Sequence, residues 1–217
     1  MLYYFLVIIM KQNYDQILEK IISNHVSKNE VPSVLLHSCC APCSSYVIEY
    51  LSKYFSITVL YYNPNISPFS EYEKRKSEQI RLIKSMPTKY PVHILDCDYD
   101  NDLYEEKICG LENEPEKGAR CTVCFRLRLD KAACEAAKGH FDYFATTLTL
   151  SPYKNAPLIN SIGFDLEKIY HVSYLPSDFK KKNGYKRSIE LSYEYHLYRQ
   201  DYCGCVYSKR DRDKLRD

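Results

Sequence analysis

The sequence has no hydrophobic run long enough to cross a bilayer and no strong excess of charge of one sign. Its first ten residues, MLYYFLVIIM, are apolar, but a membrane-spanning helix needs roughly 20 such residues. The run also lacks the basic flank and cleavage site of a secretory signal. We therefore expect a cytoplasmic protein without a membrane partner, with Met10 as the true start or residues 1–10 as a loose appendage. The net charge of +2 gives no global electrostatic case for a nucleic-acid partner.

Repeats, long linkers and low-complexity segments are also absent, and 217 residues suit one domain. We expect an N-terminal extension and helix over 1–30, an α/β core over 31–170, and a C-terminal segment over 171–217 that completes a metal site. Tryptophan is missing, but there are 22 tyrosines and 10 cysteines. Tyrosine is compatible with stacking on single-stranded RNA, although it also fills half-buried positions. In a reducing compartment, ten cysteines favour free, metal-bound or redox-active thiols over a disulfide framework.

Strand-like and helix-like patterns alternate along the chain. Apolar and β-branched runs predict four strands, a buried one within 32–39 and three more within 56–63, 90–97 and 141–150. Amphipathic segments predict helices between and after them, at 44–55, 69–86, 121–140 and around 187–200. Alternation at this spacing predicts an α/β fold, a parallel sheet flanked by helices, followed by a helical C-terminal segment rich in Tyr and Lys.

Polar and thiol side chains follow three of the predicted strands. In parallel sheets, sites form where the carboxyl ends of the strands meet. We therefore expect one edge of the sheet to gather Cys39, Cys40 and Cys43 after the first strand, Asn63 and Asn65 after the second, and Thr147, Ser151 and Lys154 after the fourth.

Seven cysteines fall into three close groups: Cys39, Cys40 and Cys43; Cys121 and Cys124; Cys203 and Cys205. This spacing is compatible with three kinds of site: a structural zinc site, a thiol–disulfide relay and an iron–sulfur cluster. Seven thiols exceed the needs of one four-ligand site, which favours a cluster together with something else. Cys97, Cys109 and Cys134 stand apart and are more simply explained as small buried hydrophobic residues.

Two other classes of protein share some of these features. A zinc-stabilised RNA-binding module without redox chemistry would use the cysteines and tyrosines, and its zinc content would distinguish it. An ATP-using thiolase of the PP-loop type would share the α/β fold, but it needs a Gly- and Ser-rich loop after the first strand. The residues Cys-Cys-Ala-Pro-Cys occupy that turn here, which argues against a thiolase.

Six longer motifs resemble one family. They are HSCCAPCS, YYNPNISPFSEYEKR, EPEKGARCTVCFRLRL, ATTLTLSPYKN, DFKKKNGYKRSIELS and LYRQDYCGCVYS, and they resemble the cobalamin-independent epoxyqueuosine reductases (QueH) from about residue 31 to 208. The resemblance implies a Rossmann-like α/β fold and the last step of queuosine synthesis. That step removes the epoxide oxygen from epoxyqueuosine at the wobble position of tRNAs with GUN anticodons, which are the Asp, Asn, His and Tyr tRNAs.

The resemblance also implies a [4Fe-4S] cluster beside a mononuclear iron. By analogy, one cysteine of the pair Cys39 and Cys40 would bind the cluster together with Cys121, Cys124 and one of Cys203 and Cys205. The remaining cysteines, with Cys43, would hold the iron, although some members have Asp where Cys43 stands. A ferredoxin or flavodoxin is the electron donor we expect for this chemistry.

Converting an epoxide to an alkene takes two electrons and two protons and releases water. We expect the proton donor among Tyr72, Tyr153 and Asp178, and we interpret His37 as a satisfied core histidine. For tRNA we expect contacts from Arg75, Arg126 and Lys154 near the anticodon loop, and from the basic segment containing Lys180, Lys181, Lys182 and Lys186 around Tyr185. Tyr198, Arg199, Gln200 and Tyr202 lie beside the CGC sequence and either recognise the modified base or support the cluster.

Overall fold

The computed structural model describes residues 12–214 and 216, and within them the chain folds around one parallel sheet. The strands are β1 (Ser33–His37), β2 (Ser56–Leu60), β3 (Val92–Leu95), β4 (Tyr143–Thr146) and β5 (Ser173–Tyr174), in the order β3-β2-β1-β4-β5. All pairings are parallel, so the α/β prediction and its four strands are confirmed. The two-residue β5 is too short to show a periodic pattern and was not predicted.

The helices are α1 (Tyr14–Ser27), α2 (Ala41–Leu51), α3 (Phe69–Ser85), α4 (Asn101–Lys107), α5 (Ala119–Lys138), α6 (Ala156–Tyr170), α7 (Gly184–Glu194) and α8 (Val206–Asp213). A short 3₁₀ turn, η1 (Thr147–Leu150), follows β4. None of the described helices combines the length and apolarity needed to cross a membrane. The expectation about Met10 and residues 1–10 lies outside the described residues.

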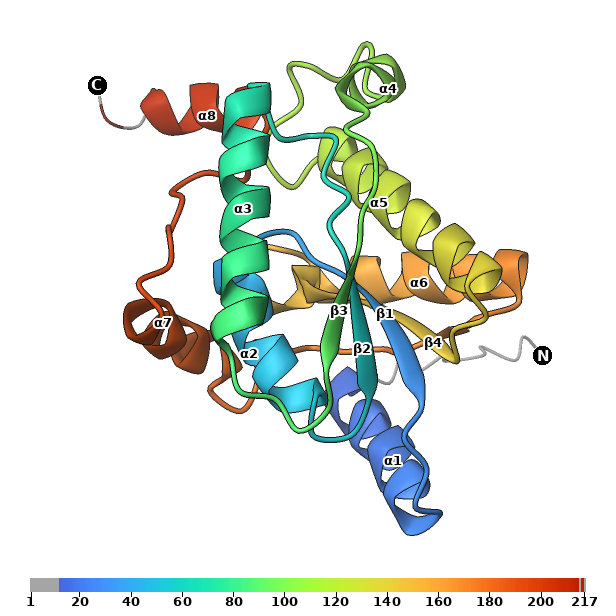
Figure 1. The fold of residues 1–217 in the computed structure, drawn as a ribbon. Coiled ribbons are helices and arrows are strands. Elements are labelled where there is room, and N and C mark those ends of the chain that lie inside the picture. Colours follow the sequence, from blue (N-terminus) through green and yellow to red (C-terminus); the bar gives the residue numbers. More distant parts are fainter. Residues whose placement is uncertain (1–11, 215, 217) are drawn as a thin grey trace, which may run out of the picture.

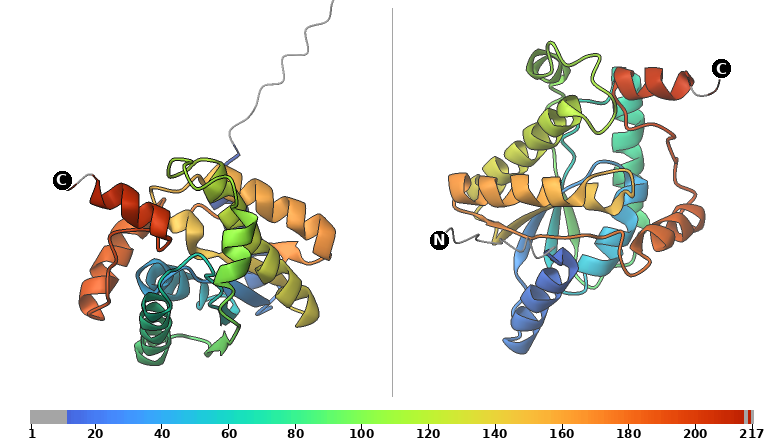
Figure 2. Two further views of the ribbon diagram at one scale, coloured as in Figure 1. Left: turned by 90° about the horizontal axis from the view of Figure 1, so that it is seen from above. Right: turned by 180° about the vertical axis from the view of Figure 1, so that it is seen from behind.

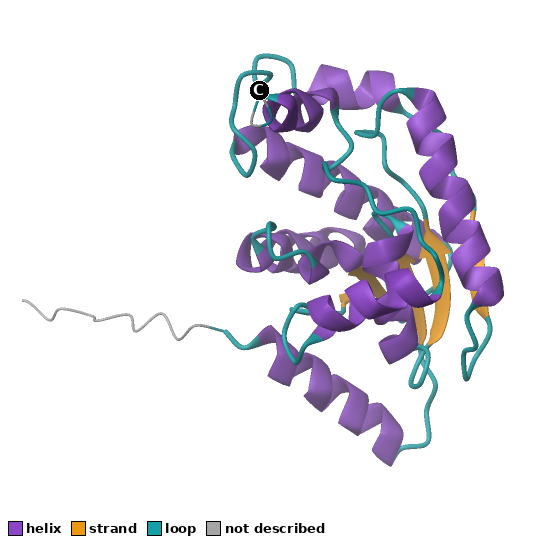
Figure 3. Ribbon diagram, turned by 90° about the vertical axis from the view of Figure 1, so that its left-hand side faces the viewer, coloured by secondary structure: helices purple, strands orange, loops and turns teal. Residues whose placement is uncertain are grey.

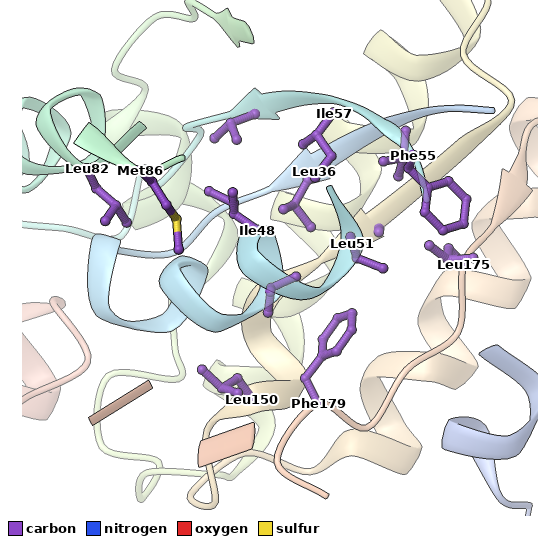
Figure 4. Close-up of a cluster of buried hydrophobic side chains, with 14 of the residues drawn as sticks. Leu36, Ile48, Leu51, Phe55, Ile57, Leu82, Met86, Leu150, Leu175 and Phe179 are labelled. Atoms are coloured by element: carbon purple, nitrogen blue, oxygen red, sulfur yellow. The ribbon is translucent and has the colours of Figure 1, made fainter. Parts of the chain in front are cut away.

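Helices cover both faces of the sheet (Figure 3) because successive side chains of a strand point to opposite sides. Val34 and Leu36 of β1 pack on one face with α1, α2, α3 and α7, and Figure 4 shows part of this cluster around Leu36 and Ile48. Leu35 packs on the other face with α5 and α6, which lie over the sheet when it is seen from behind (Figure 2). The central strands β1, β2 and β4 are rich in apolar residues because both of their faces are covered, whereas the edge strand β3 is only partly buried.

The carboxyl ends of the three central strands are level with one another. His37, the last residue of β1, pairs with Leu60 at the end of β2 and with Thr146 at the end of β4. The segments that follow these strands therefore begin side by side. Above this edge, α4, the start of α5 and α8 come together (Figure 1), and the Tyr207 hydroxyl of α8 donates to Glu105 Oε2 of α4 at 2.7 Å.

Candidate functional site

Three cysteines gather where β1 leads into α2, two in the connecting turn and Cys43 in the first turn of the helix. The Sγ atoms of Cys39, Cys40 and Cys43 all lie within 4.8 Å of one another. Cys40 is the extended residue that precedes α2, and Pro42 stands in the first helical turn, where its fixed φ favours helix initiation. The turn thus directs three thiols, which we call the cysteine trio, to one point.

Buried polar groups hold this turn in place. Asn63 Nδ2 donates to the Ser38 carbonyl at 2.8 Å. Ser38 and Ser44 each donate a hydroxyl to Gln79 Oε1 of α3 at 2.7 Å. Thr147 Oγ1 accepts from the Cys39 amide at 3.1 Å and donates to Cys39 Sγ at 3.4 Å. The trio is therefore anchored to α3 and to the segments after β2 and β4.

Four more cysteines, which we call the cysteine quartet, line a small cavity beside the trio. Cys121 and Cys124 lie one turn apart near the start of α5, so that they share a helix face. Cys203 and Cys205 come from the loop before α8. Cys124 and Cys205 are buried against Tyr104 of α4 and against Ile108, the residue that follows α4.

A main cavity of about 880 Å³ joins the two groups of cysteines. Its lining includes the whole trio and Cys203 of the quartet, so that Cys203 faces both cavities. All ten cysteines of the chain are free thiols in the structure. The structure therefore brings the seven clustered cysteines together as two adjoining sets of thiols; their role as metal ligands stays a prediction.

The loop that carries Cys203 and Cys205 depends on Gly204. This residue has φ +128°, and a Cβ here would lie 2.9 Å from Ile66 Cγ1, so only glycine fits without strain. The Gly204 carbonyl accepts from the Ser67 amide at 3.0 Å, and the Cys203 carbonyl accepts from Arg75 Nη1 at 3.2 Å. These hydrogen bonds fasten the loop to the segment after β2 and to α3.

Three arginines are fully buried around the quartet. Arg75 pairs with Glu71 at 2.7 Å. Arg120 donates to the Glu112 carbonyl at 2.9 Å and lies 3.9 Å from Asp211. Arg128 donates to the Cys124 carbonyl at 3.2 Å and lines both cavities. The charges of Arg120 and Arg128 favour the thiolate forms of the nearby cysteines and so oppose the effect of burial.

Ionisation differs among the thiols. Hydrogen bonds from Cys40 and Cys43 lower the pKa of Cys39, although burial opposes them. The same hydrogen bonds raise the pKa of Cys40 to about 12 and that of Cys43 well above its usual range. Burial raises the pKa of Cys124 to about 12 as well. Metal binding at these thiols would therefore release protons.

His37 is a satisfied core histidine, as predicted. Its Nε2 lies 3.1 Å from the Tyr62 carbonyl and must donate, so Nδ1 accepts from the Thr146 hydroxyl at 2.9 Å. Burial lowers the His37 pKa to about 3, so the ring is neutral at physiological pH. The His37 ring therefore supports the end of β1 and lines neither cavity.

The three predicted proton donors occupy different places. Tyr153 is 64% exposed and lines both cavities. Tyr72 is buried and donates to the Tyr61 carbonyl at 3.3 Å, and Asp178 pairs with Lys180. Tyr72 and Asp178 line neither cavity, so their catalytic roles remain predictions that the geometry does not support.

The residues predicted to bind substrate fall into three positions. Those that line a cavity are Asn65, Ser151, Lys154, Arg199 and Tyr202. Those that support the cysteines from behind are Asn63, Arg75 and Thr147. Those that line neither cavity are Arg126, Lys180, Lys181 and Lys186. Lys182 pairs with Asp15 and Glu19 of α1, and Lys181 donates to Asn13, so this basic segment is tied to the N-terminal helix.

Sequence reasoning missed several cavity residues. Arg128 had a usable signal, because it lies four residues after Cys124 and so shares its helix face. Lys117 and Arg212 line the main cavity, but they come from a loop and a helix whose positions no local pattern reveals. Tyr104 reaches the quartet from α4, again without a local signal.

Comparison with known proteins gives one consistent result. The sequence model of the family described as "Epoxyqueuosine reductase QueH" matches residues 34–211. The chain belongs to the epoxyqueuosine reductase QueH family. It is 46% identical to a QueH protein of Streptococcus pyogenes serotype M1, over 92% of this chain and 79% of that protein. It is 47% identical to one from Staphylococcus epidermidis, over 91% of this chain and 85% of that protein.

The QueH assignment confirms the resemblance that the six motifs indicated, and the matched range covers both groups of cysteines. Among solved structures, a likeness is found to the U34-tRNA thiolase NcsA of Methanococcus maripaludis, described with its [4Fe-4S] cluster. The two share 13% identity and a TM-score of 0.48, over 89% of this chain and 69% of that one.

Proposed function

We propose that this QueH chain converts epoxyqueuosine in tRNA to queuosine by two-electron deoxygenation at an iron–sulfur centre. The main support for this proposal is that the chain belongs to the QueH family. Seven free thiols around two adjoining cavities supply the ligands that such a centre needs. The substrates are the Asp, Asn, His and Tyr tRNAs, the reductant is a small electron carrier such as a ferredoxin or flavodoxin, and the site of action is the cytoplasm.

The residues fit the cofactors that the family resemblance implied. The quartet presents four thiols around one cavity, which is the full complement for a [4Fe-4S] cluster. The trio, with sulfurs within 4.8 Å of one another, would hold the separate iron. This division differs from the sequence interpretation, in which Cys39 or Cys40 joined the cluster. When bound, the cluster would supply electrons one at a time and the iron would act as a Lewis acid.

Lys154 is well placed to act on the substrate oxygen, because it lines both cavities. Burial lowers its pKa, but the charges of Cys203, Cys39 and Cys43 outweigh burial and raise it. The ammonium therefore keeps its proton at neutral pH and can donate a hydrogen bond to the epoxide oxygen. Tyr153, beside it at the opening, would deliver a proton from solvent or stack on a base.

Metal content and turnover test the proposal together. Anaerobically purified chain is expected to contain iron and sulfide, with more iron than sulfide, and to convert epoxyqueuosine-containing tRNA with a chemical reductant. Zinc in place of iron, in a chain that cannot be reconstituted with a cluster, would overturn the assignment and favour an RNA-binding module without redox chemistry.

Two substitutions on α5 sharpen the test. Cys121→Ala removes a quartet thiol, and we expect it to lose most of the sulfide and to abolish turnover while circular dichroism still reports the α/β fold. Cys134→Ala removes a thiol from the same helix away from both cavities, and we expect it to keep both properties. Full activity in Cys121→Ala would contradict the quartet as cluster ligand.

A further inference from the structure

Arg128 is a buried cation without a carboxylate partner among the described residues. Its side chain is 1% exposed. Nε donates to the Cys124 carbonyl at 3.2 Å and Nη1 reaches Asn63 Oδ1 at 3.5 Å, whereas Nη2 has no hydrogen-bond partner within the described part of the chain. Arg75 and Arg120, the other two buried arginines, each have an acidic residue nearby.

A guanidinium keeps its charge at any physiological pH, and a buried charge without a partner is strongly unfavourable. The environment of Arg128 must therefore contain negative charge in the functional state. Arg128 lines both cavities; burial lowers its pKa, but negative charge on Cys124, Cys203 and Cys39 outweighs burial and raises it. These thiols belong to both the quartet and the trio, so Arg128 lies between the two sets of sulfur donors.

We propose that Arg128 is a positioning residue whose buried guanidinium provides the counter-charge for the thiolate-bound metal centre and raises its reduction potential. This inference rests on the proposed iron–sulfur function. A fixed positive charge stabilises the more negative, reduced form of a nearby redox centre, and hydrogen bonds toward its sulfurs act in the same direction. Burial makes the effect large, because little water screens the interaction.

The test compares reduction potentials of the reconstituted full-length chain without tRNA. Anaerobic titration, followed by visible absorbance and electron paramagnetic resonance, is carried out on wild type, Arg128→Met, Arg128→Gln and Arg128→Lys. Arg126→Met is the matched control, since it removes an exposed arginine two positions away on the same helix. Iron and sulfide per chain are measured in every sample.

We expect Arg128→Met and Arg128→Gln to have more negative potentials. At the wild-type midpoint, their ratio of reduced to oxidised centre should be about tenfold lower, which corresponds to about 59 mV for one electron. Arg128→Lys, which keeps the charge, should remain close to wild type, and Arg126→Met should not shift. Loaded Arg128→Met and Arg128→Gln with the wild-type potential would overturn the inference.

Loss of the cluster is also informative. If both neutral variants remain folded and fail to load, while Arg128→Lys loads, positive charge is required to assemble the centre, which supports Arg128 as its counter-charge. If Arg128→Lys fails as they do, the shape of the side chain matters and its charge does not, and the inference is wrong. A wild-type chain that never loads a cluster would instead defeat the proposed function.

Discussion

At the scale of single residues, the site depends on backbone conformations that few side chains tolerate. Gly204 adopts φ +128° directly between two quartet cysteines, and a Cβ there would lie 2.9 Å from Ile66 Cγ1 and 3.1 Å from Arg75 Nη1. Gly110 also has a positive φ, +82°, but a Cβ there would meet nothing within 4 Å. The two glycines therefore separate backbone strain from steric displacement of the cysteines.

Gly204→Ala is expected to lose most of the iron and sulfide, because the new methyl group must push Cys203 and Cys205 away from Ile66. Gly110→Ala also places a side chain at a positive φ, at a backbone cost on the order of 1–3 kcal/mol, but meets no neighbouring atom and should keep its metal. Iron and sulfide analysis with thermal unfolding of both variants checks this. Equal metal loss in the two would mean that general destabilisation, and not the placement of the loop, is responsible.

At the scale of elements, α3 holds the C-terminal segment against the core. Arg81 Nη2 donates to the Tyr195 carbonyl at 2.9 Å, and Glu78 Oε1 accepts from the Tyr198 amide at 2.7 Å. Nearer the N-terminus of α3, Arg75 Nη1 donates to the Cys203 carbonyl. One helix face therefore sets the path of the chain from α7 to the quartet.

Removing the Glu78 carboxylate should loosen this path. In Glu78→Gln we expect hydrogen–deuterium exchange to lose protection at the Tyr198 amide, whereas the exposed Glu73→Gln on the same helix should not change it. Arg81 and the Tyr198 amide hold the pKa of Glu78 below its usual 4.5. The hydrogen bond to the carboxylate is thus fully formed above that pH and weakens as the pH falls through the lowered value.

When the pH falls below the lowered pKa of Glu78, the Tyr198 amide of the wild-type chain should therefore exchange about as fast as it does in Glu78→Gln. Protection at Tyr198 that is unchanged in Glu78→Gln would show that Arg81 and the hydrophobic packing suffice to hold the segment.

At the scale of the whole molecule, the lysines and arginines differ in whether an acidic residue already neutralises their charge. Lys117, Lys154 and Arg199 line the main cavity and form no ion pair within the described residues. Lys180 and Lys182 pair with acidic residues, away from both cavities. Free cations beside the cavity are better placed to bind phosphates than neutralised ones elsewhere.

Two double variants distinguish these regions. Lys117→Ala/Arg199→Ala should weaken tRNA binding and reduce the slope of log affinity against log salt by about 0.7–0.9 for each phosphate that is no longer neutralised. Lys180→Ala/Lys182→Ala removes the same number of charges, both of them ion-paired, and should leave both quantities nearly unchanged. The reverse result, measured by binding titrations at several salt concentrations, would restore the basic segment as the main tRNA-binding surface.

The alternation of strands and helices was determined by the sequence itself, because burial on both faces of a strand and on one face of a helix leaves a local periodic pattern. The gathering of Cys39, Cys40 and Cys43 with Lys154 at the carboxyl edge followed from the same pattern, since all strands of a parallel sheet end on the same side. The CGC sequence and its neighbouring motifs were sufficient to indicate the family.

Tertiary structure alone decided which polar residues face the cavity. Thr147 turned out to hold Cys39, a residue 108 positions earlier, and Lys182 pairs with Glu19 of α1. Arg128 became a buried cation between two sets of thiols. Such interactions join residues far apart in the chain, and their energies depend on burial and on the charges of neighbouring elements. No local pattern records either quantity, so only the folded chain could assign these roles.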